Sequence, residues 1–221
     1  ASFLTRSNDF QLLQAQDAEE AAKREGLPIE VLFADNNPVE QIQQLFRFIH
    51  APAEERPAAI LVETVSGDGM ERVARNALQA GIGWVLLNRR VPYLEELSAR
   101  FPTLPVCSIG TDQEEIGHIQ GRQFKTLLPG GGSVLYIQGP PDTSAAQERL
   151  RGMQESIAGA KIHVTVIDGR WTGESAEKAI QAWWRLKTSA AVRLDLVGAQ
   201  NDAMAMGARE VLLAYPDEAR R

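Results

Sequence analysis

Two Asn-Asp pairs follow short apolar runs near opposite ends of this chain. Asn8-Asp9 comes after the apolar start at residues 2–5, and Asn201-Asp202 comes after the run at residues 194–198. A strand that delivers polar side chains to the start of a helix is how a parallel α/β sheet presents groups to a ligand. We expect Asp9 and Asp202 to cap the helices that follow. Two such pairs, one early and one late, suggest two lobes that face one cleft.

Chelating and stacking side chains follow the other predicted strands. Carboxylates, amides and arginines offer paired donors or acceptors in a plane, so each can bind neighbouring hydroxyls. Aromatic rings can cover the C–H faces of a ligand. Together these groups fit a pyranose or a similar polyol, which carries hydroxyls around its rim. The candidate ligand-binding residues are Asn8, Phe10, Glu63, Asn88, Arg89, Arg149, Trp171 and Asn201.

Arg149 lies near the start of a predicted helix, where an unpaired cation is disfavoured by the positive end of the helix dipole. We therefore expect a ligand or a carboxylate partner beside it. The three histidines, His50, His118 and His163, are scattered, and we expect no Glu or Asp at metal-ligand spacing from them. The sequence predicts no metal site, no cofactor and no catalytic residue. No nucleophile is paired with a base, which argues against an enzyme.

Short β-rich runs alternate with longer amphipathic runs, the rhythm of βα units around a parallel sheet. One helix is predicted over 10–24, and another begins after Asp112 and ends before Pro129. Residues 91–105 hold three prolines and no sharp period, so we expect a long connection there. The predicted lobes are residues 1–109 and 110–221. Strands are predicted near residues 2–5, 29–34, 58–63, 84–88, 106–111, 133–138, 163–168 and 194–200.

Composition narrows the class of protein. The 221 residues carry a formal net charge of -6 and are 44% hydrophobic, with no concentrated Lys and Arg, which argues against a nucleic-acid partner. No apolar run approaches the ~18 residues of a membrane span, and residue 1 onward does not read as a signal peptide. The lone cysteine, Cys107, excludes an internal disulfide, and we expect it to be buried in its strand.

In this order and spacing the motifs resemble the type I periplasmic binding proteins of the ribose and galactose group, a fold shared with the effector domains of LacI-type repressors. The resemblance runs from Phe3 to Tyr215. It is carried by Ser7-Asn8-Asp9-Phe10, Asn88-Arg89, Gly110-Thr111-Asp112, Ile137-Gln138-Gly139, Thr143-Ser144-Ala145-Ala146 with Arg149, and residues 200–208. It implies an α/β fold of two Rossmann-like lobes with parallel sheets, and a sugar contact at the candidate positions.

Three positions depart from the family pattern. Asn88 stands where the family usually has an acid, and Gln11 stands in place of a second N-terminal aromatic residue. Glu63 falls where relatives often have Asn or Asp. Family members also continue beyond the late Asn-Asp strand, so the resemblance implies that the C-terminal part of the fold is absent from this chain.

The resemblance implies a solute-binding receptor that captures a sugar or related polyol in an interlobe cleft for an ABC-type importer. Its expected partners are the small ligand and the membrane subunits of the transporter, its expected location is periplasmic or extracytoplasmic, and it is expected to be mostly monomeric. The alternative is the ligand-sensing domain of a LacI-type transcription regulator or of a membrane sensor kinase.

Overall fold

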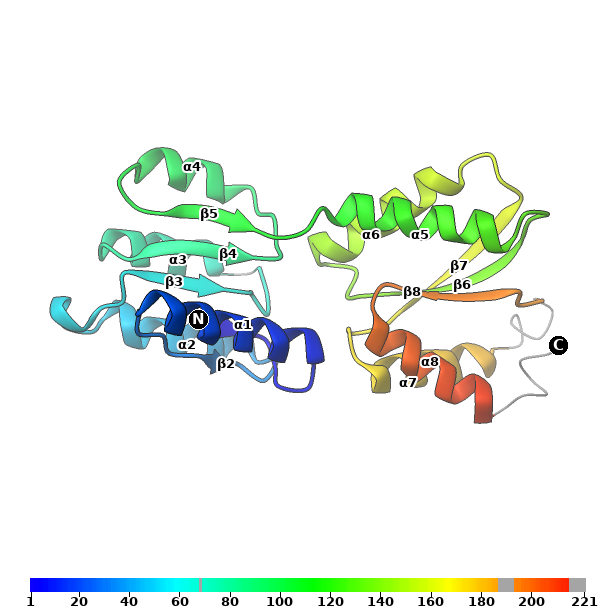
Figure 1. The fold of residues 1–221 in the computed structure, drawn as a ribbon, viewed down its shortest axis with the longest axis horizontal. Helices are drawn as coiled ribbons and strands as arrows, with labels where there is room; N and C mark the ends of the chain where they lie inside the picture. Colours follow the sequence, from blue (N-terminus) through cyan, green and yellow to red (C-terminus); the bar gives the residue numbers. More distant parts are fainter. Residues whose placement is uncertain (68, 187–192, 215–221) are drawn as a thin grey trace. The chain divides into compact units, whose positions relative to one another are not determined.

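The computed structural model describes residues 1–67, 69–186 and 193–214. The chain divides into two compact units, Ala1–Thr111 and Asp112–Arg221. Each unit is built on a parallel sheet (Figure 1). The predicted α/β fold with parallel sheets is therefore confirmed. Within the described ranges, no helix is both long and apolar enough to cross a membrane.

The first unit holds a five-stranded sheet in the order β2-β1-β3-β4-β5, and every neighbouring pair is parallel. The order reverses at β1, so β1 and β3 flank a topological switch point, where open α/β sheets bind ligands. The elements are β1 (Ser2–Phe3), α1 (Asp9–Glu25), β2 (Leu32–Phe33), α2 (Pro38–Ile49), a 3₁₀ turn (Ala53–Glu55), β3 (Ala59–Val62), α3 (Met70–Gln79), β4 (Gly83–Leu87), α4 (Tyr93–Arg100) and β5 (Val106–Ile109).

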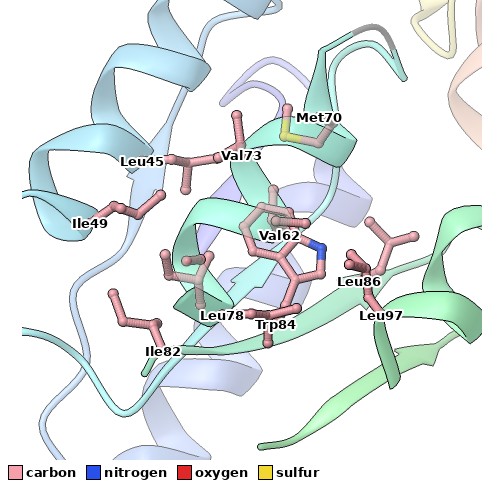
Figure 2. Close-up of a cluster of buried hydrophobic side chains, with 13 residues drawn as sticks. Leu45, Ile49, Val62, Met70, Val73, Leu78, Ile82, Trp84, Leu86 and Leu97 are labelled. Atoms are coloured by element: carbon pink, nitrogen blue, oxygen red, sulfur yellow. The ribbon is translucent and has the colours of Figure 1, made fainter. Parts of the chain in front are cut away.

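Alternate residues of the central strands pack on opposite faces of this sheet. Val62, Trp84 and Leu86 are buried under α2, α3 and α4, in the cluster that Figure 2 shows. Val85 and Leu87 point to the other face, where they pack with Ala15 of α1. Burial of both faces explains why β4 is apolar along its whole length.

The expected long connection at residues 91–105 is wrong, because the segment contains α4. Its prolines flank the helix instead of interrupting it: Pro92 is the residue before the first turn, and Pro102 follows the C-cap Phe101. Proline is tolerated at helix starts and beyond helix ends. Leu97 is fully buried in the core cluster, so tertiary packing selects the helix.

The expectation that Cys107 is buried is also wrong, although the residue does lie in a strand. Cys107 is exposed, and so is Ile109, with 58% of its surface accessible. These residues pair in register with Val85 and Leu87, so they share the face that α1 covers. Since β5 is at the edge of the sheet and pairs only with β4 among the described strands, α1 leaves its outer residues uncovered.

The second unit repeats the pattern on a three-stranded parallel sheet in the order β7-β6-β8. Val134 and Tyr136 face α5 and α6, while Leu135 and Ile137 face α7 and α8. The order again reverses at the first strand, so β6 and β8 flank the second switch point. The elements are α5 (Gln113–Leu127), β6 (Gly132–Gln138), α6 (Ser144–Ile157), β7 (Ile162–Asp168), α7 (Gly173–Trp184), β8 (Leu196–Ala199) and α8 (Asp202–Ala214).

Candidate functional site

The carboxyl edge of the first sheet gathers five of the candidate residues. Asn8 and Phe10 follow β1, Glu63 follows β3 directly, and Asn88 and Arg89 follow β4. The two candidates Glu63 and Asn88 are joined by a hydrogen bond, since the Asn88 Nδ2 donates to Glu63 Oε2 at 3.0 Å. We call this group, together with Gln11, the first half-site.

Glu63 is the charged centre of the first half-site, and only 6% of its surface is exposed. Loss of water by burial raises the pKa of its carboxyl group above the ordinary value. Hydrogen bonds from Gln11 and Asn88 and the nearby positive charge of Arg89 act in the opposite direction. These contacts hold the Glu63 carboxyl group, a hydrogen-bond acceptor, at the strand ends, where burial keeps most water away from it.

Asn88 has a left-handed backbone, with φ at 55°, a conformation that asparagine tolerates better than most residues. The turn is packed closely, because a Cβ added at Gly110 would lie 3.2 Å from the Asn88 Cα. Arg89 is 9% exposed, and its carbonyl accepts a 2.6 Å hydrogen bond from the Ser108 hydroxyl. The two residues after β4 are thus held by the neighbouring β5 segment.

Asn8, rather than Asp9, caps α1, so the expected cap is wrong by one residue. Asn8 has an extended backbone, and its Oδ1 accepts from the Gln11 backbone N–H at 3.3 Å. A capping side chain must reach the second or third helical residue, a condition that Asn8 meets and Asp9, inside the first turn, does not. Phe10, in that same turn, leaves 54% of its surface accessible, so its ring is available to a ligand.

The second half-site is at the carboxyl edge of the second sheet and holds the other three candidates. Arg149 is in α6, Trp171 lies between β7 and α7, and Asn201 lies between β8 and α8. The Arg149 Cζ lies 5.5 Å from the centre of the Trp171 ring. Asn201 Nδ2 donates to the Trp171 carbonyl at 3.0 Å. The three predicted residues therefore contact one another through Trp171.

Arg149 has neutral hydrogen-bond partners. Its Nε donates to Gln113 Oε1 at 2.7 Å, and its Nη1 donates to the Gln200 carbonyl. No carboxylate pairs with it among the described residues. Burial lowers the pKa of Arg149, and the nearby Tyr136 opposes the shift. Because a guanidinium remains charged in proteins, Arg149 is a fixed cation with donor groups still available to a ligand.

Trp171 is held in a backbone conformation that bulky residues rarely adopt, with φ at 64°. Its indole lies against Gly139, where an added Cβ would come within 2.1 Å of the ring. Asn201 caps α8 as well as binding the Trp171 carbonyl, since its Oδ1 accepts from the Met204 N–H at 2.9 Å. The expected cap at Asp202 is therefore also wrong by one residue. A strained backbone such as that of Trp171 is found mainly at functional sites.

His118 contradicts the expectation that the histidines lack acids at metal-ligand spacing. Its ring nitrogens lie 3.3 Å from Glu115 Oε2 and 3.1 Å from Glu155 Oε2, and Glu114, His118 and Glu155 can bring one ligand atom each within 4.8 Å. The sequence does show Glu114 and Glu115 one helical turn before His118, but it gives no sign of Glu155, which is on α6 while His118 is on α5. Glu114 already pairs with Arg151. These contacts make the group a bridge between two helices.

Three glutamines that shape the half-sites were not predicted. Gln11 binds Glu63, Gln113 binds Arg149, and the Gln200 side chain accepts from the Gly139 N–H at 2.9 Å while donating to the Ala146 carbonyl. All three are buried. Gln11 is the third residue of α1 and Gln113 the first residue of α5, so a place in the first helical turn is the local signal that they share.

A family model described as periplasmic binding protein domain matches residues 2–218. The chain belongs to this family. Among its relatives, a putative rhizopine-binding protein of Rhizobium meliloti is 27% identical over 97% of this chain and 67% of its own length. The ribose import binding protein of Escherichia coli is 26% identical over 94% of this chain and 65% of its own length. The chain thus spans about two thirds of the length of these relatives.

The fold is shared with solved members of the family. An ABC transporter solute-binding protein from Mycobacterium smegmatis, solved with bound glycerol, aligns with a TM-score of 0.83 and 23% identity. The alignment covers all of this chain and 71% of that protein. At this identity the likeness shows the fold, a periplasmic binding protein architecture, and the two half-sites lie at strand ends of that architecture.

Proposed function

We propose that this chain is the ligand-binding part of a solute receptor that captures a sugar or related polyol and delivers it to an ABC-type importer. Each half-site supplies side chains that bind the ligand. The receptor works outside the cytoplasm as a monomer, meets the membrane subunits of the transporter, and carries out no chemical reaction.

The observation that carries this proposal is that both half-sites hold groups that bind hydroxyls. The first holds the Glu63 carboxylate and the Asn88 amide oxygen as acceptors, since the Asn88 Nδ2 hydrogens are already bonded to Glu63 and Gln14, and it also holds the Arg89 guanidinium. The second offers the guanidinium donors of Arg149. A hydroxyl both donates and accepts, so a ligand rich in hydroxyls can bind the groups of either half-site. The relatives named for ribose import and rhizopine binding support the same class of ligand.

A ligand screen on the full-length protein tests the function. Ribose, galactose, glycerol and myo-inositol are added, and the melting temperature is recorded. A ligand present at about 100 times its Kd should stabilise the protein by roughly 2.7 kcal/mol. No shift with any polyol, together with a clear shift for an amino acid or peptide, would contradict the proposal.

Arginine variants then test whether the half-sites bind that ligand. Arg149→Ala and Arg89→Ala should each weaken binding by ~1.5 to 3 kcal/mol, about ten- to a hundredfold in Kd, because a charge-assisted hydrogen bond is lost. Lysine should not restore affinity, since it lacks the planar fork. Arg122→Ala is the matched control: Arg122 pairs with Glu115 on the exposed surface of α5, and its loss should leave Kd unchanged.

Phe10 provides the stacking test. Phe10→Ala should reduce affinity while leaving the melting temperature of the ligand-free protein unchanged, because the ring is more than half exposed. Leu13→Ala is the control, since Leu13 is 59% exposed on the same helix. Equal effects of the two substitutions on affinity would remove Phe10 from the site.

A further inference from the structure

The Glu63 carboxylate is held by one of its two oxygens. Gln11 Nε2 and Asn88 Nδ2 both donate to Oε2, at 2.5 and 3.0 Å. Oε1 accepts no hydrogen bond from any residue in the described ranges. Oε1 is also not fully buried. In the described ranges, the fully buried side-chain nitrogen and oxygen atoms that lack a hydrogen-bond partner belong to Gln44, Trp84 and Tyr93, and not to Glu63. A buried carboxylate therefore presents one open acceptor.

Gln11 has no freedom to reverse its amide. Its Oε1 accepts the Leu4 backbone N–H at 3.0 Å, so its Nε2 must point to Glu63. Only 3% of Gln11 is exposed. Asn88 is fixed in the same way, because its second Nδ2 hydrogen goes to Gln14 Oε1 at 3.1 Å. The hydrogen-bond network thus assigns the amide orientations and with them the orientation of the carboxylate.

The two amide hydrogen bonds do not by themselves require a carboxylate. A neutral glutamine at position 63 would accept the same two hydrogens. Glu63 instead keeps a full carboxylate at the end of β3, next to the switch point between β1 and β3. A carboxylate with a free oxygen in that place can take one strong hydrogen bond from a donor.

We propose that Gln11 is a positioning residue that, with Asn88, fixes Glu63 so that its Oε1 selects a ligand group that donates a hydrogen bond, a hydroxyl or an ammonium. A group that only accepts, such as a carboxylate, is rejected at this position by charge repulsion. The inference rests on the proposed function and adds to it the residue that sets specificity in the first half-site.

Calorimetry on the full-length protein tests this with D-ribose and D-galactose, their monodeoxy analogues, D-galactosamine and D-galacturonate. In the wild type, removal of one particular hydroxyl should weaken binding about ten- to a hundredfold, the value of a hydrogen bond to a charged group. Galacturonate should bind more weakly than galactose. If galactosamine binds more weakly than galactose while the deoxy sugars bind as well as their parents, the site rejects an ammonium group and the inference is overturned.

Two variants separate positioning from stability. Gln11→Met removes the donor to Glu63. Glu63→Gln keeps one oxygen for the two amide donors but replaces the open oxygen with an NH2 group, which donates. Each should reduce the discrimination between parent and deoxy sugar to a few-fold, and the double variant should behave like Glu63→Gln alone. Gln44→Leu, on α2, is the control and should keep full discrimination. If Gln11→Met does not fold, Glu63→Gln still provides the test.

The outcomes distinguish the two claims. Sugar binding with discrimination unchanged in both variants overturns this inference and leaves the receptor function standing. No binding of any sugar or polyol by the wild type overturns the proposed function, and this inference with it. Additive effects in the double variant show that Gln11 does not act through Glu63 and overturn its positioning role.

Discussion

Asn201 is predicted to stabilise the second unit in two separable ways. Its Oδ1 caps α8 by accepting the Met204 N–H, and its Nδ2 donates to the carbonyl of Trp171. Aspartate at this position keeps the cap, because Asn and Asp are equally good N-caps, but it removes the donor. Alanine removes both contacts.

The magnitudes follow from these contacts. Loss of an N-cap costs about 1 kcal/mol, and loss of one hydrogen bond costs about as much. Asn201→Ala should therefore destabilise the protein by about 2 kcal/mol, and Asn201→Asp by about 1 kcal/mol. Asn37 is the matched control, since its Oδ1 caps α2 by accepting from Val39 and Glu40. Its alanine variant should lose about 1 kcal/mol, and its aspartate variant should match the wild type.

Urea unfolding followed by circular dichroism measures these differences, with the slope m required to stay constant. Sugar affinity is measured on the same samples. Asn201→Asp should weaken binding as well as stability, because Trp171 is then free to leave its left-handed conformation. If Asn201→Asp is as stable as the wild type and binds equally well, the bond to Trp171 contributes nothing and the argument fails.

Three further predictions concern charge and packing. Burial raises the pKa of Glu63, so the free energy of unfolding of the wild type falls as pH rises through this raised pKa. Glu63→Gln has no such proton to lose, so its stability relative to the wild type should increase from acid to neutral pH in urea titrations. Parallel curves for the two proteins would contradict this. The pKa of His118 is raised by its carboxylate partners, so its contribution is full below the ordinary histidine pKa and lost as pH rises through the higher value; His118→Gln should flatten that dependence. Gly207→Ala should cost ~1 to 3 kcal/mol, because its Cβ would lie 2.2 Å from the Gly173 carbonyl oxygen, whereas Gly67→Ala, with no atom within 4 Å, should be neutral by thermal melting.

The alternation of apolar and polar runs was enough to predict the parallel α/β architecture. Each predicted strand overlaps a described one. The candidate residues Glu63 and Asn88 directly follow β3 and β4, and Asn201 follows β8 after one intervening residue. These features depend on local periodicity and on Gly and Pro at element ends, which a sequence displays directly. The convergence of strand ends follows from parallel topology alone. The family resemblance rests on the same residues.

Tertiary structure alone decided which side chains bind each other. Gln11 reaches Glu63 across 52 positions, and His118 reaches Glu155 across 37. The proline-flanked segment forms a helix because Leu97 packs into the hydrophobic core. Cys107 is exposed only because its strand lies at the edge of the sheet. Burial and amide orientation are set by neighbours that are distant in the chain, so they are decided when the layers pack and not by the local order of residues.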